Sequence, residues 1–345
     1  MATADSRADS PNDVPDLDLT AAPIADPIAD LIERIRESAD RLHADRTDRG
    51  DLKILSRTLR ELRYAFKVFA GYRDRKKVTV FGSARTRPEA PAYQQAMDLG
   101  AAFAKENWLV ITGAGSGIME AGHRGAGRAN SMGLNIMLPF EQSANEVIRD
   151  DSKLVNMKYF FTRKLMFVKE CHAVVCLPGG FGTMDEALEV LTLVQTGKRD
   201  LVPIVLLDEP GGSYWKDWHA YVQKHLLGDG MISPEDFSLY KVTDRVKQAL
   251  DESLTFYRVY NSQRYVRKHL VFRLNQRLTD EQLATVNEQY ADILADGAFA
   301  QRDALKEEAD DTTVAELPRL VFHFNRRSYG RLRQLIDALN ALPDA

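Results

Sequence analysis

The chain has 345 residues, of which 44% are hydrophobic and 28% are charged, and its formal net charge is -4. This balance is typical of a soluble globular protein, and the length suggests two domains or one domain with extensions. The absence of a basic excess argues against a nucleic-acid partner. No apolar run approaches the roughly 18 residues that a membrane span needs.

Cysteine usage points to a reducing compartment. Only Cys171 and Cys176 are present, and the N-terminus lacks the pattern of a secretory signal, so we expect a cytoplasmic protein without disulfides. The two thiols flank His172, which makes a metal site conceivable. The simpler interpretation, two small apolar residues in a buried helix-strand segment, is favoured, and no metal is expected.

The first 76 residues precede the main domain. Residues 1–27 are rich in Ala, Asp and Pro and are predicted to form a disordered tail. Apolar residues then recur at helical spacing in 29–45 and again in 52–72, which predicts a helical extension over 28–76. These helices could cover the following domain or mediate self-association.

Residues 77–253 are predicted to form a Rossmann-like, doubly wound α/β domain, because short continuous apolar runs alternate with helical segments. The predicted strands are 78–82, 108–113, 134–139, 173–178 and 202–208, and the predicted helices are 90–105, 117–130, 160–171, 183–196 and 214–227. Ligands of such sheets bind beyond the carboxyl ends of the strands. We therefore expect the turns at 82–83, 113–117, 139–141 and 178–183 to share one rim.

The last 92 residues have a different pattern. The strings "LVFRLNQR" (270–277) and "LVFHFNRR" (320–327) are nearly identical, and each precedes a helical segment. Residues 254–345 are therefore predicted to be a small accessory α/β domain built from a repeated β-α unit, with chance similarity of two amphipathic strands as the alternative.

The stretch "VVCLPGGFGTMDEALEVLT" (174–192) joins a strand to a helix through three glycines. Glycines let a ligand approach the backbone closely, and free amides at a helix start attract phosphate. Alternatively, Thr183 and Glu186 form a capping box that only stabilises the helix. If both a phosphate and the carboxylate are present, repulsion places the phosphate over 180–183 and Glu186 one turn along, about 5.4 Å away.

Two other segments bear on the same rim. Arg163 and Lys164 open the preceding helix, where the helix dipole disfavours cations, so an anion is expected to compensate them. The loop "TGAGSGIME" (112–120) has a Gly-x-Gly turn without the full dinucleotide-binding spacing. P-loop, Gly-x-Ser-x-Gly and HExxH motifs are absent from the sequence.

The motif "PGGFGTMDE" (178–186), the upstream "FFTRK", and the loops "VFGSA" and "TGAGSGIMEA" resemble those of the LONELY GUY (LOG) family. The resemblance covers about residues 77–250. It implies a Rossmann-like fold, a dimer or larger homo-oligomer, and no cofactor. The implied activity is hydrolysis of the N-glycosidic bond of nucleoside 5′-monophosphates, AMP or cytokinin riboside monophosphates, to free base and ribose 5-phosphate.

The resemblance also assigns residues. Arg163 and Glu186 would be essential for hydrolysis, and the substrate contacts would be Gly82, Ser83, Gly113, Gly115, Gly117, Glu120, Glu141, Lys164, Gly179, Gly180, Phe181, Gly182, Thr183, Asp185 and Thr192. The sequence departs from the family pattern in two places: "GAGSG" replaces a Gly-Gly-Gly loop, and Asp185 replaces a Glu.

In the expected mechanism Glu186 stabilises an oxocarbenium-like transition state or activates water, while Arg163 holds the phosphate or the carboxylate in register. Glu120, Asp185 and Glu141 are candidate proton donors to the base. The alternative is a nucleotide-binding or sensing protein without turnover. A pyridoxal phosphate decarboxylase is disfavoured, because no lysine stands in a recognisable Schiff-base context.

Overall fold

The structure is a computed structural model that describes residues 28–137 and 143–343. The described part of the chain divides into two compact units, with the boundary between Arg57 and Thr58. The predicted disordered tail, residues 1–27, lies outside the described residues. Both predicted N-terminal helices are present as α1 (Ala29–Ala44) and α2 (Arg49–Ala70). None of the described helices combines the length and apolar character that a bilayer crossing requires.

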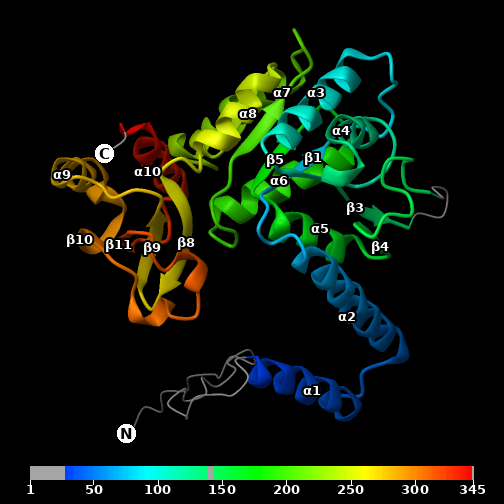
Figure 1. Cartoon of the computed structure of the whole chain (residues 1–345), viewed down its shortest axis with the longest axis horizontal. Coiled ribbons are helices and arrows are strands. Elements are labelled where there is room, and N and C mark those ends of the chain that lie inside the picture. Colours follow the sequence, from blue (N-terminus) through cyan, green and yellow to red (C-terminus); the bar gives the residue numbers. More distant parts are fainter. Residues whose placement is uncertain (1–27, 138–142, 344–345) are drawn as a thin grey trace, which may run out of the picture. The chain divides into compact units, whose positions relative to one another are not determined.

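The second unit contains a parallel seven-stranded sheet in the order β4-β3-β2-β1-β5-β6-β7 (Figure 1). Its strands are β1 (Lys77–Phe81), β2 (Leu109–Thr112), β3 (Ser131–Ile136), β4 (Leu154–Met157), β5 (Ala173–Cys176), β6 (Ile204–Leu207) and β7 (Lys241–Thr243). The strand order reverses between β1 and β5. This reversal opens a crevice at their carboxyl ends, where open α/β sheets bind ligands.

Helices cover both faces of this sheet, as the doubly wound prediction requires (Figure 1). They are α3 (Pro91–Lys105), α4 (Ile118–Ala126), α5 (Phe160–Glu170), α6 (Phe181–Gln195), α7 (Tyr214–Tyr221) and α8 (Val246–Thr255), with η1 at Arg128–Asn130. One buried cluster joins the sheet to α3, α4 and α8, and another joins it to α5 and α6. The predicted fold class, a parallel doubly wound α/β domain, is confirmed.

Three local predictions differ from the structure. The edge strands β4 and β7 were not predicted. The helix predicted over 214–227 is helical throughout, but it changes from α7 (Tyr214–Tyr221) to a π-helical segment, η2 (Val222–Leu227). A separate short helix, η3 (Pro234–Leu239), follows it. The predicted boundary at 253/254 falls within α8, where Ser253 is fully buried.

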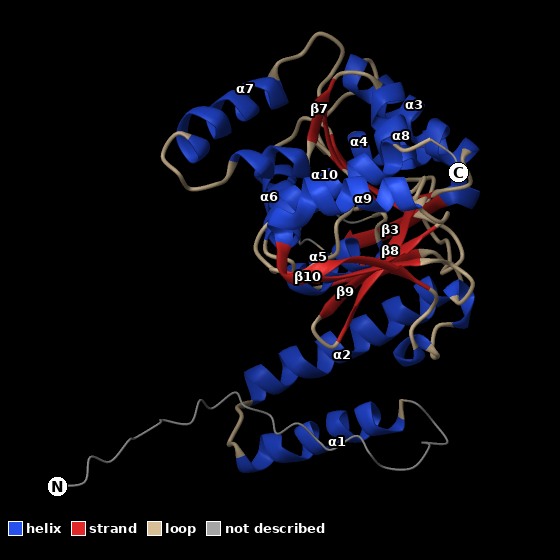
Figure 2. Ribbon diagram, turned by 90° about the vertical axis from the view of Figure 1, so that its left-hand side faces the viewer, coloured by secondary structure: helices blue, strands red, loops and turns tan. Residues whose placement is uncertain are grey.

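The C-terminal region forms a four-stranded antiparallel sheet in the order β10-β11-β9-β8. Its elements are β8 (Tyr260–Val266), β9 (His269–Leu274), α9 (Asp280–Tyr290), η4 (Ala291–Ile293), β10 (Leu294–Arg302), η5 (Lys306–Glu308), η6 (Thr312–Val314), β11 (Arg319–Phe324) and α10 (Tyr329–Ala341). The two similar strings form β9 and β11, which pair with each other. The repeating unit is ββα, one strand longer than the predicted β-α unit, and α9 and α10 lie together on one face (Figure 2).

Candidate active site

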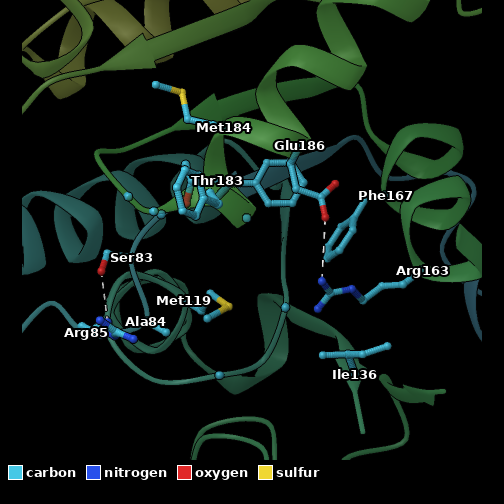
Figure 3. Close-up of a pocket in the computed structure, with 18 of the residues that line it drawn as sticks. Ser83, Ala84, Arg85, Met119, Ile136, Arg163, Phe167, Thr183, Met184 and Glu186 are labelled. Atoms are coloured by element: carbon cyan, nitrogen blue, oxygen red, sulfur yellow. Dashed lines mark hydrogen bonds and ion pairs between the residues drawn. The ribbon is translucent and has the colours of Figure 1, made fainter. Parts of the chain in front are cut away.

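A cavity of about 910 Å³ opens at the carboxyl end of the parallel sheet, next to the β1–β5 crevice (Figure 3). Loops after β1, β2 and β5, together with the N-terminal part of α6, contribute most of its wall. The lining residues are Phe81, Gly82, Ser83, Ala84, Arg85, Gly113, Gly115, Met119, Asn135, Ile136, Phe160, Arg163, Phe167, Gly179, Gly180, Phe181, Gly182, Thr183, Met184, Glu186 and Tyr214. The three described turns that were predicted to share one rim therefore meet at this cavity.

The N-terminus of α6 forms one wall of the cavity. The helix begins at Phe181 with Gly180 as its N-cap, and no side chain caps it. The amides of Gly180, Phe181 and Gly182 have no acceptor among the described residues, and a Cβ at Gly180 or Gly182 would meet open space. Free amides at the positive end of a helix dipole are suited to binding an anion.

The capping box predicted from Thr183 and Glu186 is wrong. The helix begins two residues before Thr183, because Gly180 supplies the extended N-cap conformation. Glu186 therefore lies five residues into the helix, roughly 7.5 Å along its axis from Phe181. A capping role does not account for this carboxylate.

Glu186 is buried, with 5% of its surface exposed, and its Oε2 atom has no hydrogen-bond partner among the described residues. Its Oε1 lies 3.8 Å from Nη2 of Arg163 (Figure 3). Burial raises the pKa of the Glu186 carboxyl to about 7, although Arg163 and Lys164 act in the opposite direction. A carboxyl group with such a pKa is available as a base or acid near neutral pH.

Arg163 is held by the aromatic residues of its own helix. Phe160, Arg163 and Phe167 recur at helical spacing on α5, and the guanidinium lies 5.1 Å and 5.6 Å from the two ring centroids. Phe167 in turn packs edge-on against Phe81 of β1. Cation–π contacts of this kind fix the direction of the arginine toward Glu186.

The glycine-rich turn after β2 is held by a buried polar network. Ala114 adopts a φ of 60°, a left-handed conformation that is uncommon for a residue with a Cβ. Nε2 of His123 lies 3.0 Å from the carbonyl of Met132, so Nδ1 is left to accept from Nδ2 of Asn145 at 3.2 Å. Asn145 also donates to the carbonyl of Gly115 at 3.0 Å, which ties this network to the cavity wall.

Burial lowers the pKa of His123 to about 4, so this ring is neutral at physiological pH. The network therefore supports the turn through hydrogen bonds and adds no charge to the cavity. Gly117 ends the turn at a φ of 64°, and a Cβ there would meet the carbonyl oxygen of Ser83 at 2.3 Å. Glycine is required at this position because two turns touch there.

Tyr214 joins the cavity from α7. Its hydroxyl donates to the carbonyl of Gly179 at 2.7 Å, directly before the free amides of α6. The start of α7 is fixed by the buried Asp208, whose carboxylate accepts from the amides of Trp215 and Lys216. The strand β6 thus positions a side chain that supports the turn after β5.

Five residues expected to contact substrate do not line the cavity. Lys164 binds Asp185 at 2.8 Å and Glu189 at 3.0 Å, and Glu120 pairs with Arg124 at 2.7 Å. The hydroxyl of Thr192 donates to its own helix, and Gly117 serves as the N-cap of α4. Glu141 lies outside the described residues. The lining residues that belong to the expected set are Gly82, Ser83, Gly113, Gly115, Arg163, Gly179, Gly180, Phe181, Gly182, Thr183 and Glu186.

Sequence reasoning missed ten lining residues: Phe81, Ala84, Arg85, Met119, Asn135, Ile136, Phe160, Phe167, Met184 and Tyr214. Helical spacing from Arg163 could have found Phe160 and Phe167, because residues three and four apart share a helix face. Tyr214 carried no sequence signal, since it is 35 positions from its partner Gly179.

Cys171 and Cys176 are both free and buried, and burial raises the pKa of each thiol. Within the described residues, no three His, Cys, Asp or Glu side chains cluster in a way that could hold a metal ion. The described lining residues also include no lysine, so they do not fit a pyridoxal phosphate Schiff base.

Free helix-start amides, a buried carboxylate and an arginine beside it lie at the carboxyl ends of the strands, where proteins of the open α/β class bind ligands. Residues 118–253 match the family model described as possible lysine decarboxylase. Two relatives are cytokinin riboside 5′-monophosphate phosphoribohydrolases. The one from Mycobacterium tuberculosis is 29% identical over 47% of this chain and 84% of its own length. The other, LOG3 from Arabidopsis thaliana, is 29% identical over 46% of this chain and 73% of its own length. Through its seven-stranded domain, the chain is similar to members of the LONELY GUY (LOG) family.

Solved structures with a similar chain trace include two proteins connected with molybdenum cofactor. The binding protein from Rippkaea orientalis is 19% identical, with a TM-score of 0.36 over 51% of this chain and 94% of that chain. The carrier protein from Chlamydomonas reinhardtii is 21% identical, with a TM-score of 0.36 over the same shares.

Proposed function

We propose that the chain hydrolyses the N-glycosidic bond of nucleoside 5′-monophosphates, AMP or cytokinin riboside monophosphates, giving the free base and ribose 5-phosphate. The observation that carries this proposal is Glu186: a buried carboxylate with one unpartnered oxygen, beside Arg163 and beyond free helix-start amides. A protein that only binds an anion gains nothing from a carboxylate next to it, because the two charges repel. A reaction that develops positive charge on a sugar does gain from one.

The phosphate of the substrate is placed over the amides of Gly180 to Gly182, and the sugar extends toward Glu186. The revised start of α6 increases the separation between these two sites along the helix to roughly 7.5 Å. The ionised Glu186 then stabilises the oxocarbenium-like sugar or activates water. Arg163 keeps the Glu186 carboxylate oriented toward the sugar.

The proton donor to the base is neither Glu120 nor Asp185 in this proposal. Glu120 is paired with Arg124 and Asp185 with Lys164, and neither acid lines the cavity. Glu141 stays a candidate from the sequence alone. The base can also leave without a proton donor, as the sequence interpretation allowed.

The activity is tested by incubating the protein with AMP and separating free adenine by chromatography. Glu186→Gln keeps the shape of the side chain and removes its charge, and we expect it to lower kcat by about 100-fold or more. The matched control is Glu89→Gln, which changes an exposed glutamate outside the cavity lining. Binding of AMP without release of adenine by the wild type would instead identify a nucleotide-binding or sensing protein.

The protein is further proposed to act as a homo-oligomer. Helices α5 and α6 are neighbours, because Lys164 of α5 binds two acidic side chains of α6. They expose Phe161, Leu165 and Leu188 by 51%, 47% and 45%, and exposed apolar surface of this kind marks protein contacts. Light scattering of the wild type should give at least twice the mass of 38.9 kDa. Leu165→Glu combined with Leu188→Glu should lower it, and a wild type of monomer mass contradicts this part of the proposal.

A cytoplasmic location also belongs to this proposal. It depends on the two cysteines of the sequence, both of which are free thiols in the structure.

A further inference from the structure

Arg85 lies where the glycine-rich turns of the cavity meet. The amide of Ser83 donates to the carbonyl of Pro178 at 3.1 Å, which ties the turn after β1 to the turn after β5. The hydroxyl of Ser116 donates to the carbonyl of Ala84 at 2.8 Å, which ties the same turn to the one after β2. The amide of Arg85 donates to the hydroxyl of Ser83 at 3.1 Å. The backbone that carries Arg85 is therefore held from both sides.

The guanidinium of Arg85 differs from the other cations around the cavity in having no compensating charge. It lines the cavity and is exposed, and within the described residues it forms no ion pair or side-chain hydrogen bond. In contrast, Arg163 lies 3.8 Å from Glu186, and Lys164 is bound to two acidic side chains of α6. Figure 3 shows Arg85 and Arg163 on different sides of the cavity.

These positions imply different roles for Arg85 and Arg163. A phosphate dianion over the α6 amides would be repelled by an ionised Glu186, so the cavity needs positive charge in addition to Arg163. The charge of Arg163 is already directed to Glu186. Arg85 is the arginine whose charge remains available, and its turn touches the turn that carries Gly179: a Cβ at Gly179 would lie 3.0 Å from the amide nitrogen of Ser83.

We propose that Arg85 binds the phosphate group of the substrate, opposite the free amides of α6, while Arg163 serves Glu186. This inference rests on the proposed function for the identity of the substrate. It adds to the expectation from the sequence, in which Arg163 and Lys164 were the cations near the anion and Arg163 held either the phosphate or the carboxylate. A guanidinium can bind a phosphate through two parallel hydrogen bonds, which a lysine cannot reproduce.

The test compares Arg85→Ala and Arg85→Lys with Arg87→Ala. Arg87 is an exposed arginine of the same loop and is not among the residues that line the cavity. Binding of ribose 5-phosphate and of inorganic phosphate is measured by titration calorimetry, and KM and kcat are measured with AMP. Arg85→Ala should weaken ribose 5-phosphate binding and raise the KM for AMP by roughly ten- to a hundredfold.

The pattern of effects separates the two proposals. Arg85→Lys should recover part of the affinity, Arg87→Ala should stay within about twofold of the wild type, and kcat should change less than KM. Equal affinities for ribose 5-phosphate in Arg85→Ala and Arg87→Ala would overturn the role of Arg85, even if AMP is hydrolysed. If the wild type binds ribose 5-phosphate through Arg85 but releases no adenine from AMP, the phosphate role stands and the proposed hydrolysis fails.

Discussion

Glu186 shows how a single residue can satisfy two sequence patterns of which the structure supports one. Its spacing from Thr183 fits a capping box, yet the helix begins at Phe181 and the carboxylate lies inside the protein. An ionisable group in such a place lowers the stability of the fold, because desolvation disfavours its charged form. A buried ionisable group that lowers stability and lines a cavity is better explained by a functional role than by a role in folding.

The raised pKa of Glu186 predicts how stability changes with pH. Between the ordinary pKa of 4.5 and the folded value of about 7, the folded protein holds a proton that the unfolded chain has lost. The free energy of unfolding therefore falls as the pH rises through this window, and the loss is complete above about pH 7. For one buried carboxyl whose pKa rises from 4.5 to about 7, the decrease is on the order of 3 kcal/mol.

This effect is measured by urea unfolding of the ligand-free protein at pH 5 and pH 8. Glu186→Gln removes the titration, so its stability relative to the wild type should increase from pH 5 to pH 8. The control Glu89→Gln alters an exposed side chain and should follow the wild type at both values. Parallel curves for the wild type and Glu186→Gln would show that Glu186 does not titrate in this range.

At the scale of elements, the central strands were predictable and the edge strands were not. β1, β2, β3, β5 and β6 are buried on both faces and therefore appear in the sequence as short apolar runs. The edge strands β4 and β7 are short and partly exposed, so their sequences resemble loops. The first strand of each ββα repeat, β8 and β10, is likewise too polar to show the pattern.

The same limit applies to the candidate site. The glycine turns, Arg163 and Glu186 were predictable, because each lies in a short motif. Arg85 and Tyr214 were not, because their roles depend on loops that meet only in the folded chain. The start of α6 could not be fixed from sequence either, since both Gly180 and Thr183 are acceptable N-cap residues.

The link between α7 and the turn after β5 gives a prediction for an element. Tyr214→Phe removes the hydroxyl that donates to Gly179 and leaves the ring in place. Loss of one neutral hydrogen bond, about 1 kcal/mol, should weaken ribose 5-phosphate binding about fivefold, because the turn loses a constraint. Tyr221→Phe on the same helix is the control, as its side chain is 56% exposed and outside the cavity lining. Equal binding by both variants would show that α7 does not support the phosphate turn.

At the scale of the whole second unit, the two sheets share one hydrophobic core. The cluster that contains Met166 and Val190 of the α/β region continues through Phe256 and Tyr260 to Phe272 of the C-terminal sheet. Arg333 of α10 also pairs with Glu252 of α8. The C-terminal region therefore packs against the α/β region that contains the cavity. It also contacts the C-terminal end of α6, and this contact can be tested.

Gly197 and Tyr329 form that contact. Gly197 follows α6 with a φ of 68°, and a Cβ there would lie 1.9 Å from the hydroxyl oxygen of Tyr329, at the start of α10. Gly230 has nearly the same φ, 71°, but a Cβ there would meet open space. Replacing either glycine by alanine should cost about 1–2 kcal/mol of backbone strain, whereas Gly197→Ala should add about 1–3 kcal/mol from overpacking against Tyr329.

The comparison of Gly197→Ala with Gly230→Ala therefore isolates the contact between α6 and the C-terminal region. Both variants and the wild type are unfolded in urea, and Tyr329→Ala is then combined with Gly197→Ala in a double-mutant cycle. If the clash is with Tyr329, the second substitution should cost less in the Gly197→Ala background than in the wild type, because the colliding ring has been removed. Equal losses for the two glycine variants, or additive losses in the cycle, would mean that the C-terminal region does not press on the end of α6.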